Sequence, residues 1–330
     1  MSRLLTTIFA LGAFGMTAAC GGGDDPAAPG GGGGGGTVPA NVTVSSGDGQ
    51  RIVVDGQLLG PLRARVTDAQ NQGVAGVTVS WEVTQGSGTL SAATSTTDAS
   101  GEASIAFTAG SGEEEITIAA SVSGVSGVAT FTITAVAPDA ITVVAGDNQN
   151  VRTGVPLAQQ LVARVTASDG GPVPGAAVDW EVTTGDASLA AATSTANADG
   201  RASVELTAGN TVGPIEVTAT PQGLAATATF DAQASLPVTV TVTMENIAFN
   251  APGGGDDITI MLGDEVRWVN NDAVQHTATS TQEPTGGTPF DTGFLSQGQE
   301  DSVVPDVRGE WVYFCEVHPA QMVNARITVQ

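Results

Sequence analysis

From about residue 39 onward, the chain alternates hydrophobic and polar residues in short stretches. Residues 77–83 (Val-Thr-Val-Ser-Trp-Glu-Val) and 103–107 (Ala-Ser-Ile-Ala-Phe) show the pattern, and Gly, Asp and Asn separate such stretches. An alternation of period two buries one side of a strand and leaves the other in water, so each stretch predicts a strand of an antiparallel sheet. Many short strands joined by turns are typical of β-sandwiches. We therefore expect an all-β protein.

The pattern occurs twice with the same spacing. Trp81-Glu-Val-Thr and Trp180-Glu-Val-Thr lie 99 residues apart, and the same offset relates Gly101 to Gly200. A constant offset over some ninety residues indicates two copies of one domain, each long enough to have its own core. The remaining strand-like stretches form a third unit without a repeat partner. The predicted domains are residues 39–137, 138–236 and 237–330.

The N-terminal segment predicts export. Arg3 precedes an apolar run that ends in Met16-Thr-Ala-Ala-Cys20-Gly, and residues 21–38 are rich in glycine, as in a flexible linker. Residues 1–20 resemble a bacterial lipoprotein signal, in which the cysteine is acylated. This resemblance implies that Cys20 anchors the protein to a membrane of the cell envelope. The alternative is ordinary secretory cleavage after Ala19, with Cys20 left as a free thiol.

The charge of the chain limits its partners. There are 34 acidic residues against 10 basic ones, all of them arginine, and the formal net charge is −24. Nucleic acid and anionic membrane surfaces repel such a chain, whereas a basic protein is attracted to it. Residues 237–330 carry 13 acidic residues and 3 arginines. We therefore expect no nucleic-acid partner.

The C-terminal unit holds both histidines of the chain and one of its two cysteines. Cys315 and His318 are three residues apart, Met322 follows four residues later, and His276 lies 39 residues before Cys315. One thiolate, two imidazoles and a thioether form the ligand set of a mononuclear blue-copper site. Soft sulfur suits Cu(I) and imidazoles accept Cu(II), so the residues predict one type 1 copper ion that cycles between Cu(I) and Cu(II).

Two further resemblances refine the fold class. The two repeats resemble bacterial immunoglobulin-like domains of the invasin and intimin type, which implies tandem sandwiches that act as a stalk at the cell surface. The resemblance is carried by Gly73-Val-Ala-Gly-Val-Thr-Val-Ser-Trp81, Thr97-Asp-Ala-Ser-Gly101-Glu-Ala and their counterparts one repeat later. The C-terminal unit resembles the small cupredoxins of the plastocyanin, pseudoazurin and amicyanin group. This second resemblance is carried by residues 263–272, His276-Thr-Ala-Thr-Ser, Phe290-Asp-Thr-Gly-Phe-Leu and Gly309-Glu-Trp-Val-Tyr-Phe-Cys315-Glu-Val-His318-Pro.

The cupredoxin resemblance implies a Greek-key β-sandwich with His276, Cys315 and His318 as equatorial copper ligands. Met322 is the expected axial ligand. Gln321 remains the alternative, because it stands at the offset from His318 that amicyanin-like loops use. Thr277 departs from the family, which often has Asn after the first histidine.

Taken together, these features predict an exported, lipid-anchored electron carrier with a basic redox partner such as a c-type cytochrome. We expect no enzymatic activity, since a catalytic copper needs further histidines and the chain has only two. Two alternatives stay open: a structural or adhesive surface protein whose C-terminal head is not redox-active, and a protein that binds or sequesters copper. A Cys-His-His set also binds Zn²⁺, although Met or Gln is an unusual fourth ligand for zinc.

Overall fold

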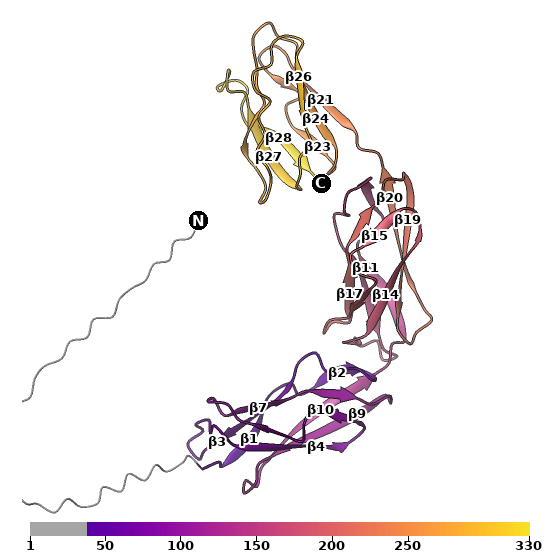
Figure 1. Cartoon of the computed structure of the whole chain (residues 1–330), viewed down its shortest axis with the longest axis vertical. Coiled ribbons are helices and arrows are strands. Elements are labelled where there is room, and N and C mark those ends of the chain that lie inside the picture. The colour runs from indigo at the N-terminus through magenta and orange to yellow at the C-terminus, as the bar shows by residue number, and fades with distance from the viewer. Residues whose placement is uncertain (1–37) are drawn as a thin grey trace, which may run out of the picture. The chain divides into compact units, whose positions relative to one another are not determined.

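The computed structural model describes residues 38–330, and every regular element in this range is a β-strand (Figure 1). The all-β expectation is therefore confirmed. Since residues 38–330 contain no helices, this range has no helical segment with the length and hydrophobicity needed to cross a membrane. Cys20 and the predicted signal and linker lie outside the described residues.

The first sandwich occupies residues 41–136. One sheet has the order β1 (Asn41–Ser46), β3 (Leu62–Thr67), β7 (Glu102–Ile105). The facing sheet has the order β2 (Gln50–Val53), β10 (Val128–Val136), β9 (Glu114–Ser121), β4 (Thr78–Gln85), β6 (Thr94–Thr96), and β5 (Gly88–Leu90) pairs with β8 (Phe107–Ala109). In the core between the sheets, the rings of Trp81 and Phe131 lie 5.7 Å apart. The Trp81 Nε1–H donates to Ser95 Oγ at 2.8 Å, so the buried indole keeps a polar partner.

The second sandwich, residues 140–235, repeats the first strand for strand. Its sheets have the orders β11 (Ala140–Ala145), β13 (Leu161–Thr166), β17 (Arg201–Val204) and β12 (Gln149–Arg152), β20 (Ala228–Ser235), β19 (Gly213–Pro221), β14 (Ala177–Thr184), β16 (Thr193–Thr195), with β15 (Ala187–Leu189) paired to β18 (Leu206–Ala208). The ring pair recurs as Trp180 and Phe230 at 5.6 Å. The 99-residue offset therefore reflects one set of core contacts used twice.

The third sandwich, residues 239–329, has a different topology. One sheet has the order β22 (Phe249–Asn250), β21 (Thr239–Met244), β24 (Glu265–Asn270), β26 (Glu300–Val303). The other has the order β23 (Ile258–Ile260), β28 (Ala325–Val329), β27 (Gly309–Phe314), β25 (Thr279–Gln282). The largest fully buried side chains of its core are Trp268, Trp311 and Tyr313. These aromatic residues therefore pack the core.

The expectation of purely antiparallel sheets is wrong in one respect. Each sandwich contains parallel pairs: β2 with β10, β12 with β20, β21 with β24, and β23 with β28. These partners are far apart in sequence, so the chain has room to cross from one end of the sandwich to the other before they pair. Side chains alternate with period two in both kinds of ladder, so the sequence pattern cannot tell parallel from antiparallel pairing.

Candidate metal centre

Three predicted ligands meet at one end of the third sandwich. His276 stands in a single bridge with Leu295 and precedes β25. Cys315 directly follows β27, and His318 lies in the loop between β27 and β28. The ligand atoms of these three residues lie within 4.8 Å of one another, and they are the metal-ligand cluster found among residues 38–330.

The loop between β27 and β28 is short and internally hydrogen-bonded. The His318 N–H donates to Cys315 O at 3.2 Å, the Met322 N–H donates to His318 O at 3.0 Å, and the Cys315 N–H donates to Met322 O at 2.9 Å. These bonds bend the chain so that the thiol and the imidazole face the same point. The relative positions of Cys315 and His318 therefore depend on the backbone of this loop, which is anchored by a strand at each end.

The distances between donor atoms suit a small cation. Cys315 Sγ lies 3.6 Å from His276 Nδ1 and 3.8 Å from His318 Nδ1, and the two Nδ1 atoms are 3.1 Å apart. A point in the plane of these atoms lies about 2.0 Å from all three, close to ordinary metal–nitrogen bond lengths in proteins. Two imidazole nitrogens at this separation repel one another when both present lone pairs, so a cation between them stabilises the arrangement. The residues present thus fit a metal ion.

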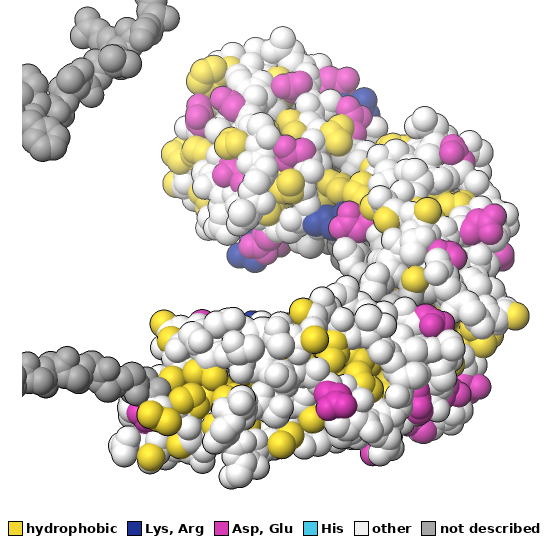
Figure 2. All heavy atoms as spheres, turned by 60° about the horizontal axis from the view of Figure 1, so that its bottom comes forward, with side chains coloured by type: hydrophobic (Ala, Val, Ile, Leu, Met, Phe, Trp, Pro, Cys, Tyr) yellow, Lys and Arg dark blue, Asp and Glu magenta, His cyan; other side chains and the backbone are white. Residues whose placement is uncertain are grey.

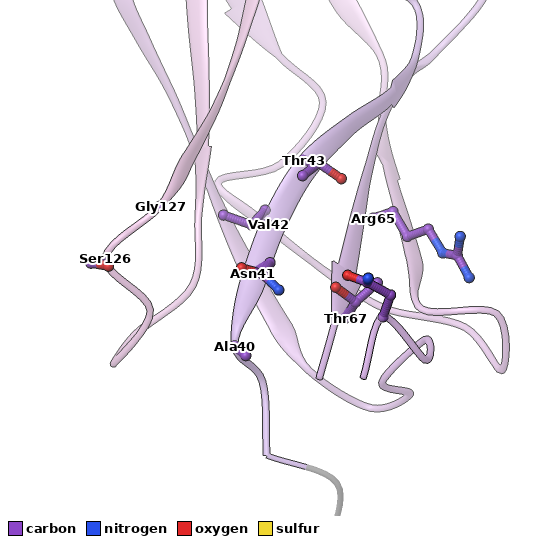
Figure 3. Close-up of a pocket in the computed structure, with 9 residues that line it drawn as sticks. Ala40, Asn41, Val42, Thr43, Arg65, Thr67, Ser126 and Gly127 are labelled. Atoms are coloured by element: carbon purple, nitrogen blue, oxygen red, sulfur yellow. The ribbon is translucent and has the colours of Figure 1, made fainter. Parts of the chain in front are cut away.

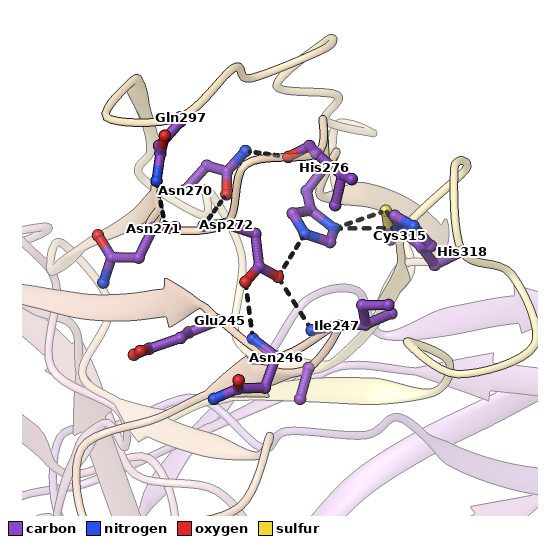
Figure 4. A network of polar contacts seen from close by, with 12 residues as sticks. Glu245, Asn246, Ile247, Asn270, Asn271, Asp272, His276, Gln297, Cys315 and His318 are labelled. Carbon is purple, nitrogen blue, oxygen red and sulfur yellow. Dashed lines mark hydrogen bonds and ion pairs between the residues drawn. The ribbon is translucent and has the colours of Figure 1, made fainter.

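His276 forms a hydrogen bond with Asp272. The His276 Nε2–H donates to Asp272 Oδ2 at 2.9 Å, which leaves Nδ1 as the lone-pair atom that faces Cys315 (Figure 4). A carboxylate that fixes the tautomer of a ligating histidine is a common feature of metal sites. The Ile247 N–H, followed by the Asn246 N–H and His276, holds the pKa of Asp272 below its usual range, against the opposing effect of partial burial. Asp272 is therefore a charged partner at neutral pH.

Thr277 joins the two ligand segments to each other. Its N–H donates to Cys315 Sγ at 3.3 Å, and its Oγ1 accepts the Glu316 N–H at 2.9 Å. Thr277 is fully buried. A hydrogen bond to sulfur tunes a metal-bound thiolate, and the hydroxyl of threonine here performs a bridging role between the two loops.

The two candidates for the axial position differ in burial. Met322 is 1% exposed and packs in the core cluster that contains Cys315, whereas Gln321 is exposed. The buried thioether of Met322 can bind a buried cation. The exposed amide of Gln321 lies in water, and nothing holds it near such a cation. Burial therefore favours Met322 over Gln321 for the axial position.

Sequence reasoning did not single out Asp272 or Asn270. Asn270 is fully buried and, like Asp272, belongs to the network around His276 (Figure 4). An acidic residue four positions before a candidate histidine ligand is the one signal that points to Asp272 in advance, because ligating histidines commonly donate to a carboxylate.

A hollow lies in the first sandwich, beside β1 (Figure 3). It has a volume of about 570 Å³, and its charged side chain is Arg65, whose Nε donates to Ser100 O at 3.3 Å. The equivalent Arg164 of the second sandwich makes the same bond to Asp199 O at 3.1 Å. A contact repeated in both copies is explained by the fold, so this hollow adds no candidate chemistry.

The fold and the site together define a tandem β-sandwich protein with a candidate His-Cys-His metal centre. Residues 43–136 match the family described as bacterial Ig-like domain (group 1), which confirms the resemblance predicted for the first repeat. No curated protein matches the chain.

Several solved structures are similar to the chain. The D0-D1 domain of intimin is 20% identical with a TM-score of 0.26, over 59% of this chain and 95% of the intimin chain. The adhesin InvE of Yersinia pseudotuberculosis is 19% identical with a TM-score of 0.30, over 62% of each chain. A variant of amicyanin in its Cu(I) form is 20% identical with a TM-score of 0.24, over 28% of this chain and 82% of the amicyanin chain.

Proposed function

We propose that this protein is a carrier of single electrons whose type 1 copper centre is formed by His276, Cys315, His318 and Met322. The observation that carries the proposal is the convergence of two imidazole nitrogens and one thiol sulfur within 4.8 Å, with the His276 tautomer set by Asp272. A trigonal His₂Cys set with a weak axial thioether is the ligand set of blue-copper electron-transfer sites.

Bound copper supplies the one-electron couple at this centre. The chain would hold its ligands in fixed positions, because Cys315 and His318 belong to one hydrogen-bonded loop and His276 is bridged to Leu295 by two backbone hydrogen bonds. Small rearrangement between states favours fast electron exchange. Cys315 is fully buried, so the thiol is also kept from solvent and from oxidation.

His318 is the ligand nearest to solvent. It is half-buried, whereas His276 and Cys315 are fully buried. Large apolar side chains are exposed on the loops that carry the ligands or contact their partners; they are Ile247, Val274, Phe294, Val317 and Val323. These features support electron transfer to a partner protein through the edge of His318.

The negative charge of the chain favours a basic partner at the cell envelope. On the face seen in Figure 2, acidic side chains are scattered over the described residues and arginines are few. This charge attracts a basic redox protein, such as a c-type cytochrome, and the association rate falls as the salt concentration rises.

The immunoglobulin-like sandwiches serve in this proposal as a stalk, and Cys20 as the lipid anchor. We propose no enzymatic turnover, because the proposed centre takes both histidines of the chain and leaves none for a catalytic copper.

The test is a titration of the purified full chain with Cu(II), followed by visible absorption and electron paramagnetic resonance. We expect an intense thiolate-to-copper band that disappears on reduction and is absent from Cys315→Ala. A colourless protein, or one that prefers zinc, contradicts the proposal. Bound copper without fast electron exchange in stopped-flow mixing supports copper sequestration instead.

A role in surface attachment is the second candidate. The match of residues 43–136 to bacterial Ig-like domains favours it, since such domains also build surface proteins in which the head need not be redox-active. An attachment protein keeps its role in Cys315→Ala, whereas an electron carrier loses it. Comparing cells that express the two forms therefore separates the candidates.

A further inference from the structure

A buried amide organises the loop that carries His276. Asn270 ends β24, and its Nδ2 donates to Val274 O and to Leu295 O, both at 2.7 Å, while its Oδ1 accepts the Asp272 N–H at 2.8 Å. Leu295 in turn exchanges two backbone bonds with His276, at 2.8 and 3.1 Å. Because every bond of this amide ends in the segment 270–276 or in the residue that pairs with His276, Asn270 holds the segment in one conformation.

A carboxylate continues the network to a neighbouring turn. Asp272 Oδ1 accepts the Asn246 N–H and Oδ2 accepts the Ile247 N–H, both at 2.9 Å, while Oδ2 also accepts from His276 Nε2 (Figure 4). Asp272 therefore links the imidazole of His276 to the tip of the hairpin formed by β21 and β22.

The hairpin tip is held in an uncommon conformation. Asn246 and Ile247 have φ angles of +58° and +56°, in the left-handed region, and the turn is closed by the Glu245 N–H to Ala248 O bond at 3.1 Å. A β-branched residue in this region is strained, and such residues persist only where the surrounding structure holds them. The bonds from Asp272 to both turn amides provide that support, so the turn and the carboxylate fix each other.

We propose that Asn270 and Asp272 are positioning residues for His276, and that the Asn246–Ile247 turn is the anchor against which they act. The proposal rests on the metal centre proposed above. Asp272 fixes which nitrogen of the ring bears hydrogen and the direction of Nδ1, and Asn270 fixes the backbone from which the ring projects. A merely structural role would stabilise the fold to the same extent with and without metal.

The first experiment measures the metal directly. Cu(II) affinity is determined by competition titration for the unmodified full chain, Asp272→Ala, Asp272→Asn and Asn270→Ser. Asp291→Ala is the matched control, because Asp291 is an exposed carboxylate of the same sandwich that accepts from Thr279 Oγ1 and the Gly293 N–H and contacts no ligand. We expect Asp272→Ala to bind copper about 10- to 100-fold more weakly, which is typical when a partner of a ligating histidine is removed.

The Asp272→Asn variant keeps an oxygen acceptor, so we expect a smaller loss than in Asp272→Ala. Thermal unfolding with and without copper is measured in parallel. Positioning predicts that the stabilisation by copper shrinks in the Asp272 and Asn270 variants. Equal loss of stability in both forms with unchanged affinity, or affinity equal to that of Asp291→Ala, overturns the proposal.

The second experiment needs no metal. The chain has two histidines, so the imidazole ¹⁵N spectrum of the untagged, metal-free protein contains the signals of two rings. We expect His276 to show one tautomer with hydrogen on Nε2 in the unmodified chain, and a mixture of tautomers in Asp272→Ala. A single tautomer in both proteins refutes the role of Asp272, whether or not the protein binds copper. A chain that shows the expected tautomers but takes up no copper contradicts the proposed function alone.

Discussion

Replacing Thr277 by valine removes a link between the two ligand segments while it preserves the shape of the side chain. In the native chain Thr277 Oγ1 accepts the Glu316 N–H at 2.9 Å and the Thr279 hydroxyl at 3.1 Å. The Thr279 hydroxyl retains Asp291 Oδ1 at 3.0 Å as an acceptor, so the Glu316 amide is the group left without a partner. Leaving such a donor unsatisfied costs about 1–3 kcal/mol.

The expected loss is large enough to measure in a unit of this size. For a domain of 60–100 residues, 1 kcal/mol shifts the melting temperature by about 4–8 °C, so we expect Thr277→Val to lower the melting temperature of the third sandwich by roughly 4–24 °C. Hydrogen exchange of the metal-free full chain is measured by mass spectrometry across a temperature series. The peptides from residues 239–329 then report the unfolding of the third sandwich separately from that of the other two.

Thr277→Ser is the matched control, because it keeps Oγ1 and removes only a methyl group, worth about 0.8 kcal/mol. By the same scale we expect Thr277→Ser to lower the melting temperature by about 3–6 °C, a smaller shift than that of Thr277→Val. Equal melting temperatures for the serine and valine variants refute the bridging role of the hydroxyl. The N–H of residue 277 still reaches Cys315 Sγ in both variants, so the copper–thiolate absorption of the proposed centre is expected in both.

Further predictions concern the axial ligand, the core and acid stability. In the copper-loaded protein Met322→Ala shifts the reduction potential, measured by redox titration, and Gln321→Ala leaves it unchanged, since only Met322 is buried with the ligands. Phe131→Ala removes a fully buried ring and destabilises the first sandwich by about 3–5 kcal/mol in chemical unfolding; a loss below 1 kcal/mol contradicts the core assignment. The hydroxyl of Ser100, followed by backbone N–H groups, holds the pKa of Asp98 below its usual range, so this carboxylate stabilises the first sandwich above the ordinary carboxyl pKa, and its contribution is lost as pH falls through the lowered value. Asp98→Asn therefore makes acid unfolding of this sandwich less dependent on pH, whereas an unchanged pH profile contradicts the argument.

The candidate ligands were predictable from the sequence because their chemistry is rare in this chain. With two histidines and two cysteines in 330 residues, the spacing of Cys315, His318 and Met322 leaves few alternatives. The short loop that carries these residues makes their convergence a local property. His276 was predictable as a ligand only through its residue type and the resemblance, since 39 residues separate it from Cys315.

The groups that orient the ligands were not predictable in the same way. Asn270, Asp272 and Thr277 are common residue types, and apart from the four-residue spacing of Asp272 from His276 no sequence signal distinguishes them from residues that face water. Their roles depend on bonds to Leu295, Ile247 and Glu316, which come from other strands and loops. The parallel pairing of β21 with β24 was not predictable for a related reason, since side chains alternate in the same way in parallel and antiparallel strand pairs.

The sequence by itself determined the all-β character, the repeated domain and the candidate ligand set. Each of these follows from local information: period-two alternation, a constant 99-residue offset, and the identity of four side chains. Tertiary structure alone decided the pairing of the sheets, the burial of Met322 beside Cys315, and the network that fixes the ring of His276. The physical reason is that these features depend on which segments, distant in sequence, pair in a sheet or pack in one core. Hydrogen bonds between such segments produce no periodic pattern in the sequence.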